Sequence, residues 1–218
     1  MNRKLMAKKC GMTRIFDDEG NPVVCTVVRV KPNHITQIKR RETDGYNALQ
    51  IGSDQIEAND ERTVERRLTK PRLGHFKRAG VAPCRHLLEV RLDDVESYQL
   101  GQAFDLSLFE GVGFVDVTAR SIGKGYQGVI KKYGFRGGPA AHGSGFHRHA
   151  GSTGMRSTPG RCLPGGPRPS HMGDERVTVQ NLRVVRMDVE KGIMLIKGSV
   201  PGPKNALLII SNAKKRST

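Results

Sequence analysis

Apolar residues in this sequence gather in short, β-branched runs rather than at the spacing of a helical face. Three such runs lie near the start of the chain, at residues 23–30, 35–39 and 46–51. Asp44 and Gly45 separate the second run from the third, and this dipeptide is typical of a hairpin turn. We therefore predict a β-meander in the first quarter of the chain.

Similar runs flank a long glycine-rich stretch in the second half of the chain. The expected strands are residues 86–92 and 112–118 before it, and 177–180, 184–188, 193–197 and 206–211 after it. Residues 188–192 are expected to form a turn. Strands at this spacing predict a barrel. The strands on the two sides must complete one sheet, because neither group alone would leave a closed edge.

Helical spacing is clearest at residues 62–78, where Pro71 and Gly74 interrupt the pattern. We expect short helical pieces there instead of one long helix. The predicted fold is mainly β with short helices, a β-barrel interrupted by a long basic, glycine-rich extension. The barrel body is expected to span residues 1–119 and 174–218, with a small helical insertion near 62–85, and the extension to span 120–173.

Charge divides the chain more sharply than hydropathy does. The chain has 37 Lys and Arg against 21 Asp and Glu, a formal charge of +16. Residues 120–173, called the basic segment below, hold nine basic residues and no acidic one, while the rest of the chain holds 28 basic and 21 acidic residues. A local excess of this kind marks a surface for a polyanion, with nucleic acid ahead of membrane.

The basic segment is also poor in the side chains that build a core. It holds 14 of the 26 glycines, and Phe146 and Leu163 are the only Leu, Ile, Val or Phe residues between positions 136 and 173. A disordered linker and an arm shaped by a surrounding partner both fit this composition. The exclusion of carboxylates favours the arm, because a carboxylate among phosphates would be repelled and desolvated.

Candidate RNA-binding residues are the basic, histidine and tyrosine side chains of the basic segment and a basic cluster at the start of the chain. Cations neutralise phosphates, and aromatic rings stack on bases. The candidates in the segment are Arg120, Lys124, Tyr126, Lys131, Lys132, Arg136, His142, His147, Arg148, His149, Arg156, Arg161, Arg168 and His171. The candidates at the start are Arg3, Lys4, Lys8 and Lys9. A further basic cluster at residues 66–78 is either a solvated face or another RNA contact.

Several motifs imitate catalytic or cofactor sites. Residues 123–128 match the G-x-G-x-x-G dinucleotide fingerprint, but the acidic residue expected about 20 positions on is missing, since none occurs before Asp174. Residues 121–124 fit S-x-x-K, the pattern of an acyl-enzyme serine nucleophile, but the S-D-N and K-T-G motifs that accompany it are absent from the sequence. The four histidines of the segment lack the spacing of metal ligands. We therefore expect no catalytic residue, no metal and no cofactor.

Signals for membrane insertion or secretion are not found in the sequence. No apolar run approaches the roughly 18 to 20 residues of a spanning helix, and residues 1–11 are too charged for a signal peptide. The four cysteines have no C-x-x-C spacing, so ordinary reduced thiols are expected. The sequence thus predicts a soluble, intracellular protein with neither a membrane nor a small-molecule partner.

Five blocks occur in order along nearly the whole chain, at residues 8–16, 74–81, 123–128, 173–180 and 197–202. Together they resemble the bacterial form of the large ribosomal subunit protein L-three family. The resemblance implies a barrel like that of translation factors and a structural role without enzymatic activity. It also implies that the protein binds ribosomal RNA near its 3′ end early in assembly, with the basic segment running toward the peptidyl transferase centre. Other large-subunit proteins would lie beside it, in the bacterial cytoplasm.

The resemblance has two departures, both in the basic segment. Ser157 stands where some relatives carry a methylated glutamine, so that modification is not expected. Gly166 and Pro167 stand where relatives commonly carry a lysine pair, and Arg168 supplies charge one step later.

Two rival functions share parts of the sequence evidence. One is an RNA-modifying or nucleotide-using enzyme with a cofactor at residues 123–128, which would need a catalytic acid or base that the chain does not supply nearby. The other is a DNA-compacting protein, which shares the charge but not a folded barrel interrupted by a glycine-rich segment.

Overall fold

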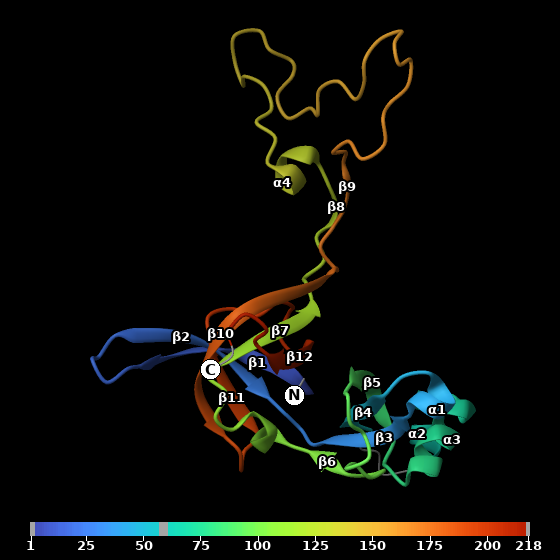
Figure 1. The fold of residues 1–218 in the computed structure, drawn as a ribbon. Helices are drawn as coiled ribbons and strands as arrows, with labels where there is room; N and C mark the ends of the chain where they lie inside the picture. The colour runs from blue at the N-terminus through green and yellow to red at the C-terminus, as the bar shows by residue number, and fades with distance from the viewer. Residues whose placement is uncertain (1–2, 57–60, 217–218) are drawn as a thin grey trace. The chain divides into compact units, whose positions relative to one another are not determined.

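The computed structural model describes residues 3–56 and 61–216, which fall into two units (Figure 1). One unit combines Met1–Arg120 with Arg176–Thr218, and the other is Ser121–Glu175. The predicted body includes residues 1, 2, 57–60, 217 and 218, which lie outside the described part of the chain. None of the described helices is long and apolar enough to cross a membrane.

Six antiparallel strands close a barrel in the first unit, in the order β1, β12, β7, β10, β11, β2. Their bounds are β1 Lys4–Phe16, β2 Pro22–Arg29, β7 Phe114–Arg120, β10 Arg176–Asp188, β11 Ile193–Lys197 and β12 Leu207–Asn212. β7 precedes the basic segment and pairs with β10 and β12, which follow it. The predicted mainly β fold with a barrel is confirmed, and strands from both sides complete one sheet.

A second, four-stranded sheet in the same unit has the order β5, β4, β3, β6. Its strands are β3 Asn33–Lys39, β4 Ala48–Gln55, β5 Cys84–Arg91 and β6 Ala103–Phe104. The helices of this unit are α1 Arg41–Asp44, α2 Glu61–Arg67, α3 Lys70–Ala79 and the 3-10 helix η1 Leu106–Phe109. The second unit contains β8 Gly125–Gln127, α4 Val129–Tyr133 and β9 Ser170–Met172.

The meander prediction was half right. β3 and β4 form the expected hairpin, although the single turn of α1, closed by Gly45 at φ 82°, replaces a two-residue turn. β2 does not join that hairpin, because it pairs with β1 and β11 in the barrel. A short apolar run specifies a strand but not its partner, and a barrel and a second sheet bury such a run equally well.

The strands after the basic segment are fewer and longer than expected. Residues 177–180 and 184–188 belong to the single strand β10, whose register shifts between Val179 and Leu182. Asn181 lies within this irregularity with a positive φ of 57°, a conformation that asparagine tolerates better than most residues. The polar residues that indicated a break therefore mark a bulge.

Two helices at residues 61–79 confirm the prediction of short pieces. Pro71 lies in the first turn of α3, where its missing amide removes no helical hydrogen bond. Gly74 lies inside α3 without ending it. Phe76 is buried and packs with Ile56 and Leu68 in a small cluster of its own.

Successive residues of β1, a strand that the sequence pattern did not reveal, serve two different cores. Leu5 and Ala7 belong to the barrel core, with Val117 and Ile210 among its other members. Met6 belongs to the core of the second sheet. Because side chains alternate along a strand, β1 is shared by both cores.

Asn33 at the start of β3 connects the second sheet to the barrel. Its side chain is fully buried. Its Oδ1 accepts a hydrogen bond from the Met6 amide at 3.0 Å, and its Nδ2 donates to the carbonyl oxygens of Met6 at 3.1 Å and Lys31 at 2.9 Å. These contacts satisfy the polar atoms of a buried amide and fix β3 against β1.

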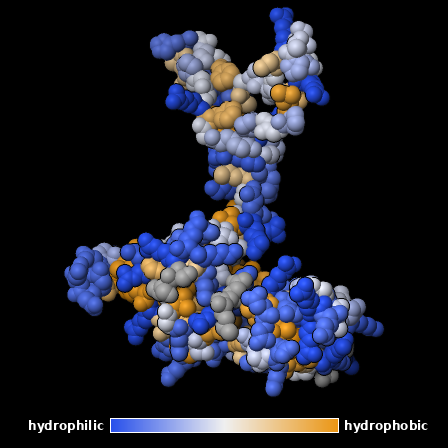
Figure 2. All heavy atoms as spheres, in the orientation of Figure 1, coloured by the Kyte–Doolittle hydropathy of each residue, from blue (hydrophilic) through white to orange (hydrophobic). Residues whose placement is uncertain are grey.

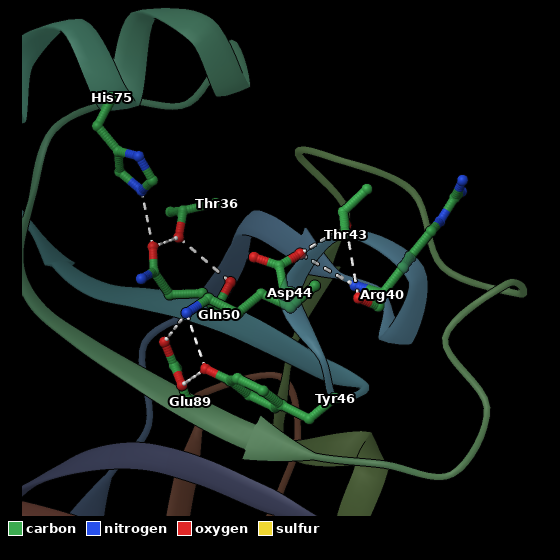
Figure 3. Close-up of polar contacts among 9 residues, drawn as sticks. Thr36, Arg40, Thr43, Asp44, Tyr46, Gln50, His75 and Glu89 are labelled. Carbon is green, nitrogen blue, oxygen red and sulfur yellow. Dashed lines mark hydrogen bonds and ion pairs between the residues drawn. The ribbon is translucent and has the colours of Figure 1, made fainter.

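A polar network holds α3 against the second sheet (Figure 3). His75 Nε2 donates to Gln50 Oε1 at 2.7 Å, and the same oxygen accepts from Thr36 Oγ1 at 2.8 Å. On β5, Glu89 Oε2 accepts from the Tyr46 hydroxyl at 2.9 Å, and Lys39 Nζ lies 2.7 Å from Glu89 Oε1. The hydrogen bond and ion pair with Lys39, followed by the Tyr46 hydroxyl, lower the pKa of Glu89.

Asn33→Ala is expected to reduce the free energy of unfolding by about 2–3 kcal/mol, because it leaves main-chain groups of a buried strand without partners. Urea denaturation of the purified chain measures the change. His34→Ala serves as control, since this half-buried neighbour makes no side-chain hydrogen bond within the described structure, and it should cost under about 1 kcal/mol. Equal losses in the two variants would contradict the role given to Asn33.

Glu89→Gln is expected to destabilise the chain at neutral pH and to matter progressively less in acid. Since folding lowers the pKa of Glu89 below its ordinary value of 4.5, its contribution is complete above that pH and disappears as the pH falls through the lowered folded value. Urea denaturation of wild type and variant over this pH range measures the difference. Glu96→Gln, at an exposed site, should show no such convergence.

Candidate nucleic-acid interface

The second unit begins and ends in a narrow two-stranded ribbon. β8 pairs antiparallel with β9, and Tyr126 lies directly opposite His171 in the register. Next to this pairing, the Lys124 amide donates to the Met172 carbonyl at 2.9 Å, and the Ser121 amide donates to the Glu175 carbonyl at 2.8 Å. Main-chain hydrogen bonds therefore hold the two ends of the segment together.

Close approach of main chains replaces a side-chain core in much of this unit. A Cβ at Gly138 would lie 2.7 Å from the Phe146 ring, and the Gly138 amide donates to the His147 carbonyl at 2.7 Å. Gly173, at φ 75°, crosses Ile122 so closely that any side chain there would collide with its carbonyl oxygen. Glycine at these positions allows the chain to fold back on itself where few apolar side chains exist to pack.

Seven cations of the second unit are exposed to solvent. They are Lys124, Lys131, Arg136, Arg148, Arg156, Arg161 and Arg168. Since residues 120–173 contain no carboxylate, their charges are not balanced within their own segment. In Figure 2 this unit is mostly blue and pale, with a few separate orange groups. Such a surface is suited to a polyanion.

Lys132 differs from these seven because the protein itself uses its ammonium group. Lys132 Nζ donates to Ser170 Oγ at 2.6 Å and to the His171 carbonyl at 2.8 Å. It also lies 5.3 Å from the centre of the Tyr133 ring. Lys132 therefore fastens α4 to β9, and a contact with RNA stays a prediction for this residue.

Aromatic and other large apolar side chains are unusually exposed in this unit. Tyr126 is 74% exposed, and its register places it on the same side of the ribbon as His171. Phe146 packs edge-on against His149, with ring centroids 6.1 Å apart. His142 and His147 are exposed as well. Exposed rings beside cations form a platform on which bases can stack.

Other large side chains of the second unit are exposed but were not among the candidate RNA-binding residues. Among them are Tyr133, Met155 and Leu163. The signal that could have identified them is the absence of a core around them, since a large apolar side chain in a segment without one has nowhere to be buried.

The fingerprint at residues 123–128 does not have the structure that nucleotide binding requires. Every strand pairing in the described part of the chain is antiparallel, and β8 covers residues 125–127 of the motif. A dinucleotide site needs a parallel βαβ unit. α4 does begin directly after Gly128, but it has only five residues and connects no parallel strands in the described structure. Ser121 Oγ accepts the amide of Glu175 at 3.2 Å. No group of three or more metal-ligating side chains occurs among the described residues.

The basic cluster at the start of the chain is largely used by the barrel. Arg3 Nη1 donates to the Leu108 carbonyl at 3.0 Å. Lys9 Nζ donates to the carbonyls of Val200 at 2.9 Å and Gly202 at 2.8 Å. Lys4 is half-buried. RNA contacts stay a prediction for these three residues. Of the four candidates in this cluster, Lys8 has the exposed side chain, and its contact with RNA is also a prediction.

Lys8 faces a second cation that the sequence reading missed. Arg29 of β2 lies directly opposite Lys8 of β1 in the barrel register. Like charges opposite each other destabilise a sheet unless an anion lies between or beside them. The two residues line a cleft of about 460 Å³, called the basic cleft, together with Lys31, Asp54, Arg85 and His86 among others.

The basic cleft has a positive environment despite its one carboxylate. Arg85 Nε lies 3.7 Å from Asp54 Oδ2. Burial lowers the pKa of His86, and the nearby charges of Arg85 and Lys8 lower it further, although Asp54 opposes them. This cleft and the second unit are separate candidate sites for phosphate groups.

A third group of cations lies at one end of the barrel. Burial lowers the pKa of Lys4, and the charges of Lys214 and Arg176 lower it further. Arg176 lies directly opposite Arg120 in the register. Lys214, Lys215 and Arg216 form a short basic stretch after β12. The Arg216 guanidinium lies 5.0 Å from the centre of the Phe114 ring, which holds this stretch against the barrel. Only the strand pairing, which the sequence did not predict, brings these cations together.

Comparison with known proteins gives one consistent result. A family model described as "Ribosomal protein L3" matches residues 94–192. The chain is 59% identical over 211 residues to the large ribosomal subunit protein uL3 of Protochlamydia amoebophila, covering 97% of this chain and 90% of that protein. It is 53% identical over 213 residues to the protein of that name from Chlamydia felis, covering 97% and 96%, and 53% identical to that from Chlamydia pneumoniae, covering 97% of each.

Lys132→Met is expected to speed amide hydrogen exchange in α4 about fivefold, because it removes two charge-assisted hydrogen bonds at a partly exposed site. Hydrogen–deuterium exchange of the RNA-free chain, followed by mass spectrometry, measures the effect. Lys131→Met is the matched control, since the neighbouring Lys131 is exposed, and it should leave exchange unchanged. A similar increase of the exchange rate in both variants would contradict the role of Lys132 in holding α4 to β9.

Proposed function

This chain belongs to the ribosomal protein L3 family, and we propose that its second unit, residues 121–175, anchors it in large-subunit ribosomal RNA. The family is a structural component of the large ribosomal subunit rather than an enzyme, and the chain is a constituent of that subunit. The proposal concerns how the chain is held there and which side chains carry the contact.

One observation carries the proposal: seven exposed cations lie on the basic segment, residues 120–173, which contains no carboxylate and few side chains that could build a core. The two carboxylates of the second unit, Asp174 and Glu175, follow this segment. The seven cations repel one another, and ordering such a chain costs conformational entropy that few apolar contacts offset. Phosphate groups around the segment would neutralise the cations and release counterions from the RNA. Ribosomal RNA would thus complete a structure that the protein only partly stabilises by itself.

The side chains would divide the work of binding by their chemistry. Arg136, Arg148 and Arg161 can each grip a phosphate with two parallel hydrogen bonds, whereas Lys124 and Lys131 act as point charges. Tyr126 with His171, and Phe146 with His149, present rings to unstacked bases. The glycines let the backbone itself come close to a phosphodiester.

The body would add a second contact through the basic cleft. Lys8 and Arg29 lie opposite each other on neighbouring strands, and a phosphate between them would turn a mutual repulsion into two attractions. The observation that supports this part is the like-charge pair, together with Arg85 at the same cleft.

The resemblance of the sequence to its family adds finer points to the proposal. We place the contact near the 3′ end of the large-subunit RNA, early in assembly, with the basic segment directed toward the peptidyl transferase centre. Other large-subunit proteins would lie beside the chain, and its place of action would be the bacterial cytoplasm, as expected for a relative of chlamydial ribosomal proteins.

Binding of the purified chain to large-subunit ribosomal RNA should depend steeply on salt. Seven phosphate contacts, at 0.7 to 0.9 each, predict a slope of log K against log salt of about −5 or steeper between about 50 and 200 mM salt. Lys124→Glu with Arg148→Glu should weaken binding and reduce the slope by about 1.4 to 1.8, because two contacts are lost. Filter binding or fluorescence anisotropy measures both quantities.

The control is Asp93→Lys, a charge reversal at an exposed position of the body. It should leave the slope unchanged and should enter large subunits in cells as efficiently as wild type, while the double variant should be depleted from them. A slope near zero for the wild-type chain, or equal behaviour of the two variants, would reject the proposed anchor.

A further inference from the structure

A two-stranded ribbon near the start of the chain extends past the barrel (Figure 1). β1 pairs with β12 as far as Lys8, and β2 pairs with β11 from Cys25 onward. In the described structure, residues 11–16 and 22–24 have no strand partner other than each other, and the Val24 carbonyl at the base of the ribbon accepts the Gly198 amide at 2.8 Å. We call residues 10–25 the N-terminal ribbon. An isolated two-stranded ribbon is marginally stable in water, so a partner is expected to support it.

One face of the N-terminal ribbon carries three large apolar side chains that are open to solvent. Phe16 is 65% exposed, and Met12 and Val24 are each 52% exposed. Alternation along the strands and their register place these three side chains on the same face, with Pro22 directly opposite Phe16. The exposed Arg14 lies on this face as well, directly opposite Val24. Apolar side chains that gather on one face, rather than scattering singly, are typical of a contact surface. Figure 2 shows orange groups at this hairpin next to a blue tip.

The tip of the N-terminal ribbon is acidic. It contains Asp17, Asp18 and Glu19, so residues 10–25 have a net charge of −2 in a chain of +16. Asp17 Oδ1 accepts the main-chain amide of Asn21 at 2.7 Å, and Gly20 takes a left-handed conformation with φ 81°. The tip is therefore a defined turn that presents carboxylates.

We propose that the N-terminal ribbon is a docking site for a basic protein neighbour in the large subunit. The apolar face of Met12, Phe16 and Val24 packs on an apolar surface of the partner, and the acidic tip meets its Lys and Arg side chains. The outer edge of β1 at residues 11–16, unpaired in the described structure, offers main-chain groups for additional hydrogen bonds. This inference rests on the proposed function, which places other subunit proteins beside the chain.

RNA is the competing occupant, and charge argues against it. The basic segment, where contact with phosphate is proposed, has no acidic residue in 54 positions, whereas the N-terminal ribbon has three in 16. Carboxylates next to a phosphate backbone would be repelled, and Arg14 is the only cation of the ribbon. The same carboxylates attract a basic protein and add specificity to an apolar contact.

A photo-crosslinking experiment in intact particles tests the proposal. The chain is expressed with p-benzoylphenylalanine in place of Phe16 or Val24, large subunits are purified and irradiated, and crosslinked peptides are identified by mass spectrometry. The expected result is a crosslink from both positions to one basic ribosomal protein. Crosslinks to ribosomal RNA alone, or no crosslink from either position, would overturn the proposal.

Position 100 provides the matched control. Leu100 is as exposed as Val24 but lies outside the N-terminal ribbon. The same photoreactive residue at position 100 should not crosslink to the same protein, and if it does, the ribbon is not the specific contact.

The charge part of the proposal has its own test. Asp18→Lys with Glu19→Lys should reduce the crosslink yield from position 16 about tenfold, because two attractions become repulsions. Asp18→Asn with Glu19→Gln should give an intermediate yield. An unchanged yield in the lysine variant would reject charge complementarity as the basis of docking.

Failure of this inference can be told apart from failure of the RNA anchor. The lysine variant should leave the RNA affinity and salt slope of the purified chain unchanged or slightly increased, since the ribbon carries a net negative charge. A flat salt slope in the wild-type chain would refute the anchor without affecting the crosslinks. Lost crosslinks with a steep slope would refute only the docking site.

Discussion

The antiparallel pairing of β7 with β10 brings the two ends of residues 121–175 together, because it sets Arg120 directly opposite Arg176. The barrel can close only if strands from both sides of the segment join, and β12 adds a second such pairing on β7. A stretch of chain that cannot form a core is thereby tethered at both ends to one that can. The hydrophobic effect stabilises the barrel strands that hold the two ends, whereas the segment itself must be stabilised by other interactions.

Those other forces differ between the two units. In the body, burial of apolar side chains stabilises the barrel, and Asn33 and the His75–Gln50–Thr36 contacts fix the second sheet and its helix. In the second unit, glycines allow main chains to approach closely, Lys132 fastens a helix to a strand, and most cations face solvent. The mutual repulsion of these like charges favours a polyanion as the partner of this unit. Folding and binding are therefore coupled in this part of the chain.

Much of this architecture follows from the sequence, but not the pairing of its strands. The runs at residues 23–30 and 193–197 predicted real strands because their burial requires an apolar stretch. β1 was missed because Lys8, Lys9 and a register shift after Lys9 obscure its alternation. The basic segment was apparent from charge alone, whereas the Lys8–Arg29 pair and the role of Lys132 depend on contacts between residues distant in sequence, which composition does not encode.

The pairing of β1 with β12 has a consequence for the order in which the chain can fold. Lys4 of β1 lies opposite Ser211 of β12, so β1 cannot complete its pairing in the barrel until β12 has been synthesised. During synthesis the basic segment leaves the ribosome before β10, β11 and β12, so it is exposed before the barrel can close. A contact between such distant positions also makes closure slow. The newly made protein therefore passes through a stage in which the basic segment has been synthesised but the barrel has not yet formed. Any factor that shields the positive charge of the segment would act at this stage.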